Sequence, residues 1–92
     1  MMNEEIKKIA DYYGYTSQAD MLIEESAEYT QAVCKVRRNG SLEAFQNVKE
    51  ELADVIVVAS QLRYLLGEAE IDKIIEEKVK RQLRRIEEEK ER

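Results

Sequence analysis

Apolar residues recur along the chain at three- and four-residue spacing, which is the spacing of one face of an α-helix. The pattern stops at each of the three glycines, Gly14, Gly40 and Gly67, and the sequence contains no proline. Glycine suits the end of a helix because it adopts left-handed backbone angles without a steric penalty. The pattern therefore predicts four helices, over about residues 3–13, 17–39, 42–66 and 69–86.

Polar residues stand where these helices need N-caps. Thr16 or Ser17 can cap the second helix, and Asp20 lies three residues after Ser17, which is the spacing of a capping box. Ser41 stands at the start of the third helix. The short connections make neighbouring helices antiparallel. We therefore expect an all-α fold, an antiparallel four-helix bundle formed by one domain over residues 1–92, in which the charged tail at about residues 87–92 is frayed.

The composition limits what such a bundle can do. A chain of 92 residues with 43% hydrophobic content is near the size at which one core is only marginally sufficient, so we expect self-association. Acidic residues outnumber basic residues by 20 to 15, and the net charge of -5 does not suit a surface for duplex nucleic acid. The sequence has no apolar run of signal-peptide or membrane-span length, and its single cysteine, Cys34, allows no disulfide within the chain. We expect a cytoplasmic protein that does not insert into a membrane.

Four carboxylates lie on or beside the apolar faces of the second and third helices. At about 100° per residue, Glu25 falls near the middle of the apolar arc of its helix, and Glu28 falls at its margin. Glu51 and Asp54 repeat this arrangement on the third helix. None of the four has a lysine or arginine three or four residues away, whereas the fourth helix pairs its charges regularly at that spacing. Ordinary solvated acids are the alternative, but unpaired carboxylates crowded near a core favour a bound cation.

The absence of histidine narrows the chemistry. It excludes Ser-His-Asp and Cys-His nucleophiles, imidazole zinc sites and Glu-x-x-His di-iron sites. A metal bound by carboxylate oxygens alone is a hard cation such as Mg²⁺, Mn²⁺ or Ca²⁺, and Mg²⁺ commonly shares its coordination with substrate phosphates. Basic residues that suit a phosphate follow one edge of the apolar stripe of the fourth helix: Lys78, Arg81 and Arg85. Their alternative role is to cover the core with their aliphatic stems.

Two acidic segments carry a resemblance to a known family. EESAE, residues 24–28, and EELAD, residues 50–54, resemble the paired EExxE and ExxD motifs of the MazG-like, all-α nucleoside triphosphate pyrophosphohydrolases. That superfamily includes dimeric dUTPases and phosphoribosyl-ATP pyrophosphatases. The likeness extends from about Tyr15 to Arg85. It implies hydrolysis of NTPs or dNTPs to the monophosphate and pyrophosphate, and assembly as a homodimer or homotetramer with sites completed at the interface.

The resemblance also implies roles for individual residues. Mg²⁺, with Mn²⁺ as an alternative, would be held by the four acids already singled out by position: Glu25, Glu28, Glu51 and Asp54. Glu24 would serve as a general base or support the ligands, and Glu25 would take part in catalysis. Gln82 stands where the family frequently has asparagine in a Lys-x-x-Arg-Asn pattern. The residues that would contact the nucleotide are Lys78, Arg81, Gln82, Arg85, Gln18 and Tyr15.

Two other interpretations remain open. A catalytically inactive helical oligomer that binds nucleotides or regulates another protein would keep the acidic cluster without turnover. An amphipathic interaction protein would bind no metal.

Overall fold

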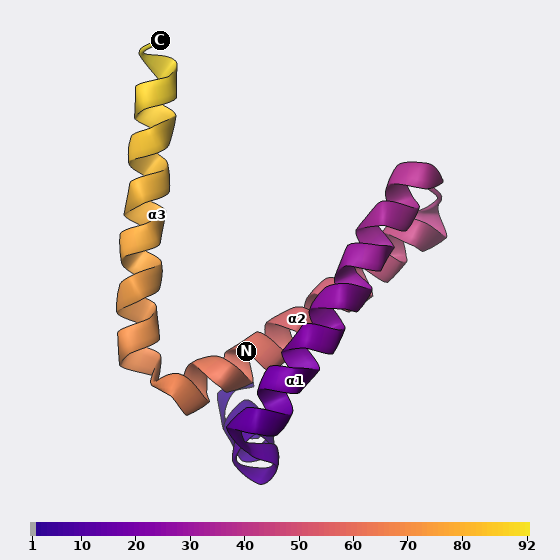
Figure 1. The fold of residues 1–92 in the computed structure, drawn as a ribbon, viewed down its shortest axis with the longest axis vertical. Helices are drawn as coiled ribbons and strands as arrows, with labels where there is room; N and C mark the ends of the chain where they lie inside the picture. Colours follow the sequence, from indigo (N-terminus) through magenta and orange to yellow (C-terminus); the bar gives the residue numbers. More distant parts are fainter. Residues whose placement is uncertain (1) are drawn as a thin grey trace.

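The computed structural model describes residues 2–92, and every regular element within that range is an α-helix. The helices are α1 (Asn3–Arg38), α2 (Leu42–Leu66) and α3 (Glu68–Lys90). The longer, C-terminal part of α1 runs antiparallel beside α2 and forms a hairpin with it, while α3 points away from this hairpin (Figure 1). The prediction of an all-α fold is confirmed. In the part of the chain that the structure describes, no helix combines the length and the apolar character needed to cross a membrane.

Gly14 kinks α1, with φ 81° and ψ 173° inside an otherwise helical run. Glycine adopts these angles readily, whereas they are strained for a residue with a Cβ. The predicted break between the first two helices is therefore present as a kink. The predicted N-cap at Thr16 or Ser17 is wrong, because glycine itself makes the turn and both residues already lie within the helix.

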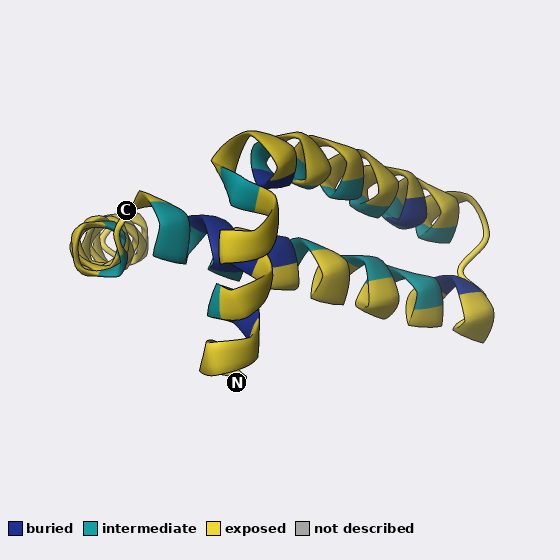
Figure 2. Ribbon diagram, turned by 90° about the horizontal axis from the view of Figure 1, so that it is seen from below, coloured by how far each residue is buried: buried dark blue, intermediate teal, exposed yellow. Residues whose placement is uncertain are grey.

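The segment of α1 before the kink lies across the open end of the hairpin (Figure 2). Ile6 and Ala10 of this segment are buried. The hydroxyl of Tyr64 in α2 donates a hydrogen bond of 2.9 Å to the carboxylate of Asp11. The ammonium of Lys7 lies 5.6 Å from the centre of the Tyr64 ring. These contacts fix the first segment on α2 at the end of the hairpin that is opposite to the α1–α2 turn.

Small and medium-sized side chains fill the seam of the hairpin. The buried apolar residues there are Ala32 of α1 and Ala44, Val58 and Leu62 of α2. Ser41 caps α2 as predicted, because its Oγ accepts a hydrogen bond of 3.1 Å from the backbone N–H of Ala44. Alanines in the seam let the two helices approach closely. Any polar side chain that points into this seam is therefore withdrawn from water.

α3 does not pack back onto the hairpin. Gly67, with φ 110°, ends α2 as predicted, and α3 begins at the next residue. Across this junction the guanidinium of Arg63 donates two hydrogen bonds of 2.6 Å to the carboxylate of Asp72, and these bonds lower the pKa of Asp72. None of the described residues of α3 is buried, and most of the helix is exposed (Figure 2). The exposed residues include its apolar stripe: Ile74, Ile75, Val79, Leu83 and Ile86.

The single chain is consequently more extended than a closed bundle. Its radius of gyration is 16.4 Å, whereas a compact domain of this length is expected to have about 12 Å. Within residues 2–92, one chain does not show the predicted four-helix bundle. The pattern of α3 predicts a face that packs against something, and that face has no partner inside the described chain. α3 continues through Lys90, so the helix includes most of the tail for which we expect fraying.

Candidate metal centre

Three of the four predicted metal ligands meet in the seam between α1 and α2. One carboxylate oxygen from each of Glu25, Glu28 and Glu51 lies within 4.8 Å of the other two. Glu25 and Glu28 are one turn apart on α1, and the antiparallel hairpin brings Glu51 of α2 beside them. The fold thus gathers acids that are more than twenty residues apart in the sequence.

Two members of this cluster are partly buried, which is unusual for carboxylates, whereas Glu28 is exposed. The Oε2 atoms of Glu25 and Glu51 are buried, and neither accepts a hydrogen bond from any residue that the structure describes. A buried polar atom without a partner is destabilising, and a buried charge without a partner is more so. The two orphaned oxygens point to a ligand of opposite charge.

Burial and neighbouring charges raise the pKa values of two members of the cluster, Glu25 and Glu51. Burial is the largest cause for Glu25, followed by the charge of Asp54 and the charge of Glu28. Burial likewise raises the pKa of Glu51 most, and the charges of Glu28 and Asp54 raise it further. Each shift means that the folded chain disfavours ionising these groups. A divalent cation among the oxygens would reverse that preference, because it favours the charged forms.

The remaining predicted acids lie at the margin. Asp54 is exposed and falls outside the group of three oxygens, although its charge acts on both Glu25 and Glu51. Glu24 is exposed on α1 next to Glu25. The structure thus separates two inward glutamates from acids that face solvent.

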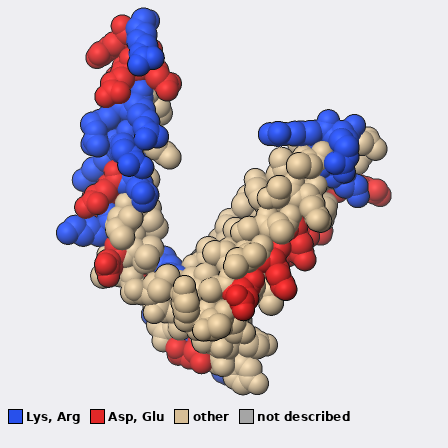
Figure 3. Space-filling view, viewed as in Figure 1, with Lys and Arg blue, Asp and Glu red and all other residues tan. Residues whose placement is uncertain are grey.

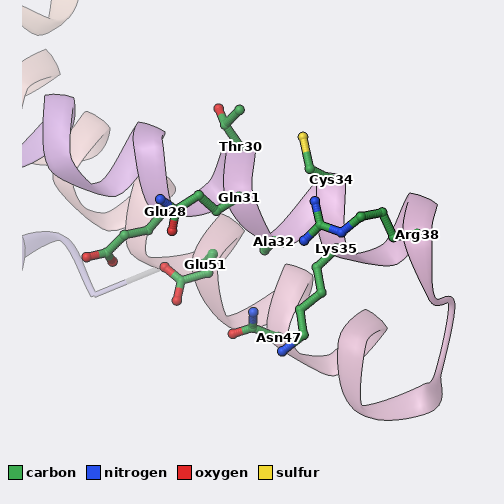
Figure 4. A pocket seen from close by; sticks show the side chains of 9 residues that line it. All are labelled: Glu28, Thr30, Gln31, Ala32, Cys34, Lys35, Arg38, Asn47 and Glu51. Atoms are coloured by element: carbon green, nitrogen blue, oxygen red, sulfur yellow. The ribbon is translucent and has the colours of Figure 1, made fainter.

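A hollow of about 680 Å³ adjoins the acidic cluster. Glu28 and Glu51 form one side of it, and Asn47 lies one turn from Glu51 on α2 (Figure 4). Two cations also line it, Lys35 and Arg38, and our sequence reasoning missed both. The spacing contained a signal for one of them, because Lys35 is seven residues, or two turns, after Glu28 and therefore on the same face of the helix.

The predicted basic residues of α3 are not near the acidic cluster of their own chain. Lys78, Arg81, Gln82 and Arg85 are all exposed. They lie on the arm that leaves the hairpin, where blue side chains cover much of the surface, whereas red side chains follow one edge of the hairpin (Figure 3). One described chain therefore does not join these cations to the acidic cluster.

The two predicted nucleotide contacts on α1 differ in exposure. Gln18 is buried, and its side-chain amide donates a hydrogen bond to the amide oxygen of Gln61 on α2, so this group is already engaged inside the seam. Tyr15 is exposed and lines an apolar hollow of about 540 Å³ together with Leu22 and Leu62. Tyr15 is thus accessible to a ligand.

Comparison with models of protein families supports the resemblance noted in the sequence. Residues 14–88 match the model of the MazG nucleotide pyrophosphohydrolase domain. The matched segment contains both acidic motifs and the basic positions of α3. Searches of curated proteins and of solved structures gave no match. Because the family model covers most of the 92 residues and the acids of both motifs meet in space, the chain belongs to the MazG nucleotide pyrophosphohydrolase domain family.

Proposed function

We propose that this chain is a Mg²⁺-dependent hydrolase that converts a nucleoside triphosphate and water into the nucleoside monophosphate and pyrophosphate. The observation that carries the proposal is the pair of buried carboxylate oxygens, on Glu25 and Glu51, without a hydrogen-bond partner in the described chain. The match to the family supports a nucleotide as the substrate.

The donor set fits a hard divalent cation. Carboxylate oxygens are the ligands that Mg²⁺ and Mn²⁺ prefer, and the residues that would hold the ion are Glu25, Glu28, Glu51 and Asp54. The ion would supply positive charge at phosphate oxygens and lower the pKa of a water molecule.

The marginal acid next to the cluster suits proton transfer. Glu24 is exposed beside Glu25, so its carboxylate is available to accept a proton from the water that attacks the α-phosphorus. The bond between the α-phosphorus and the bridging oxygen breaks, and the pyrophosphate leaves with the electron pair of that bond. Glu25 acts from inside the cluster, where it orients the reacting groups.

We further propose that the enzyme is a homodimer or homotetramer in which α3 packs on the hairpin of a second copy. The exposed stripe of α3 supports this assembly, as does a second exposed apolar row on α2, formed by Phe45, Leu52 and Ile56. Exposed apolar rows of this kind commonly mark interfaces. In the assembly, Lys78, Arg81, Gln82 and Arg85 of one copy would approach the acids of another, and the helices of two copies would complete four-helix packing.

A panel of NTPs and dNTPs incubated with Mg²⁺ tests the activity, with pyrophosphate and the monophosphate measured as products. We expect turnover of at least one nucleotide, and its loss in Glu25→Gln and Glu51→Gln. Glu43→Gln is the matched control, because Glu43 is an exposed acid on the same helix as Glu51. Activity that survives the loss of Glu25 would overturn the proposal. Binding of nucleotide without any turnover would instead support the inactive nucleotide-binding oligomer.

Subunit mixing tests the shared site. Glu51→Gln and Arg81→Ala proteins, each inactive alone, should regain activity when they are mixed, because a heterodimer can combine the intact acids of one copy with the intact α3 of the other. No recovery in a mixture that demonstrably exchanges subunits would contradict a site built from two copies.

A further inference from the structure

Two cations of α1 share a hollow with the acidic cluster. Lys35 and Arg38 line the same space of about 680 Å³ as Glu28 and Glu51. Lys35 lies about 10.5 Å along the helix axis from Glu28, on the same face. Side chains of a helix lean toward its N-terminus, which directs both cations back toward the acids. Figure 4 agrees, since the Arg38 guanidinium extends back along α1 and the Lys35 ammonium lies beside Asn47.

Neither cation is engaged elsewhere in the described chain. Ion pairs join Arg63 to acids of α3 and join lysines to acids within α3, but Lys35 and Arg38 take part in none that the described residues form. Both side chains are exposed. Together with Arg37 they form the basic last turn of α1, at the end of the hairpin where Figure 3 shows a cluster of blue side chains.

We propose that Lys35 and Arg38 bind the β- and γ-phosphates of the substrate, the part that leaves as pyrophosphate. This inference rests on the proposed function. The reacting α-phosphate must lie beside the acidic cluster, where the ion would be held. The other anionic groups of a nucleoside triphosphate are the β- and γ-phosphates, and they need positive charge close by. The cations that share a hollow with the acids within the same chain are Lys35 and Arg38.

The chemistry of the two side chains suits this role. Arginine donates in a planar fork to two phosphate oxygens, and lysine supplies a compact positive charge. The hollow has the size of a ligand site, and the amide of Asn47 adds a neutral donor and acceptor to its wall. As the pyrophosphate leaves, its growing negative charge is met by groups that stay fixed on α1.

A purely structural role for these residues would be interaction with the C-terminal end of the α1 dipole. A substitution of Arg37 distinguishes this structural role from phosphate binding. Arg37 stands in the same last turn, so it shares the dipole, but it is not among the described residues that line the hollow. Arg37→Ala is therefore the matched control for Lys35→Ala/Arg38→Ala.

Product inhibition tests the inference. We compare inhibition by pyrophosphate and by the nucleoside monophosphate in the wild type, Lys35→Ala/Arg38→Ala and Arg37→Ala. In the double variant the inhibition constant for pyrophosphate should rise by about tenfold or more, since charge-assisted hydrogen bonds to phosphate are lost. Inhibition by the monophosphate and the affinity for Mn²⁺ should stay as in the wild type, and Arg37→Ala should match the wild type throughout.

A second readout does not require turnover. Cys34 is the single cysteine, is exposed and lines the hollow, so bound pyrophosphate should slow its reaction with a maleimide in the presence of Mg²⁺. This protection should disappear in the double variant and persist in Arg37→Ala.

The outcomes separate this inference from the proposed function. Suppose that the double variant hydrolyses nucleotide and that its inhibition by pyrophosphate and its Cys34 protection equal those of the wild type. This result would overturn the phosphate site and leave the proposed function standing. Suppose instead that the wild type hydrolyses no nucleotide and that pyrophosphate fails to protect Cys34 only in the double variant. This result would support the phosphate site and overturn the proposed activity. An equal loss in Arg37→Ala, or no protection of wild-type Cys34 at any pyrophosphate concentration, would also overturn the site.

Discussion

The exposed stripe of α3 permits a quantitative test of assembly through Leu83→Ala. Fully burying a leucine side chain is worth about 1.5–3 kcal/mol. Leu83 is 57% exposed in the single chain, so burying the remainder at an interface is worth about 0.9–1.7 kcal/mol per copy. A symmetric dimer buries this residue twice, which makes the expected loss about 1.7–3.4 kcal/mol, or roughly 20- to 300-fold in the dissociation constant. Alanine keeps the Cβ, so the lower part of this range is expected.

Sedimentation equilibrium over a range of concentrations measures this change directly. Alanine favours the helix, so circular dichroism should show that α3 is retained in the variant. Glu88→Ala is the control, because Glu88 lies on the opposite side of α3 from Val79, at about 100° per residue, and should leave assembly unchanged. A wild-type protein that sediments as a monomer of 10.8 kDa at every concentration would refute the reasoning. So would a Leu83→Ala protein whose dissociation constant equals that of the wild type.

Three further predictions concern stability. Burial and neighbouring carboxylates raise the pKa of Glu51 above its ordinary value of 4.5, so metal-free protein loses stability as the pH rises from 4.5 through that raised pKa. The melting temperature of Glu51→Gln should therefore exceed that of the metal-free wild type, and the difference should grow toward pH 7. A difference that does not change with pH would contradict the raised pKa of Glu51. Gln61→Leu leaves the buried amide of Gln18 without its partner and should cost about 1–3 kcal/mol in urea unfolding, most of it recovered in Gln18→Leu/Gln61→Leu. Gly14→Ala should cost about 1–3 kcal/mol because of the φ of 81°, whereas Gly40→Ala, where the added Cβ would meet its nearest atom at 3.4 Å, should cost clearly less.

The acidic cluster could be predicted from the sequence because two local signals agreed. Helical periodicity put Glu25 and Glu51 on apolar faces, and the lack of a cation at helical spacing distinguished them from solvated acids. Antiparallel pairing then required the two faces to meet, and their carboxylate oxygens do lie together. Ser41 and Gly67 were predicted equally well, since a helix end is a local event.

The features that could not be predicted are contacts with residues that are distant in the sequence or belong to another chain. The pattern of α3 shows that one face is apolar, but a pattern does not say whether the covering surface belongs to the same chain. Gln18 was predicted as a nucleotide contact, but its amide is engaged in the seam by Gln61, which is 43 residues away in the sequence. Lys35 was missed because pairing was sought only within one turn, and its relation to Glu28 spans two.

The two groups of cations are held by the fold in different ways, and this difference bears on how a MazG-like site divides its tasks. Lys35 and Arg38 share the hairpin with the acidic cluster, so the proposed metal ligands and the proposed phosphate-binding cations all lie within α1 and α2. Lys78 and Arg81 lie on α3, which points away from the hairpin, so in the proposed assembly they would approach the acidic cluster of a second copy. A hairpin that carries both the acids and the leaving-group cations would bind polyphosphate before assembly. The α3 residues of the second copy would then contact the nucleoside, which polyphosphate lacks, and would close the site around it.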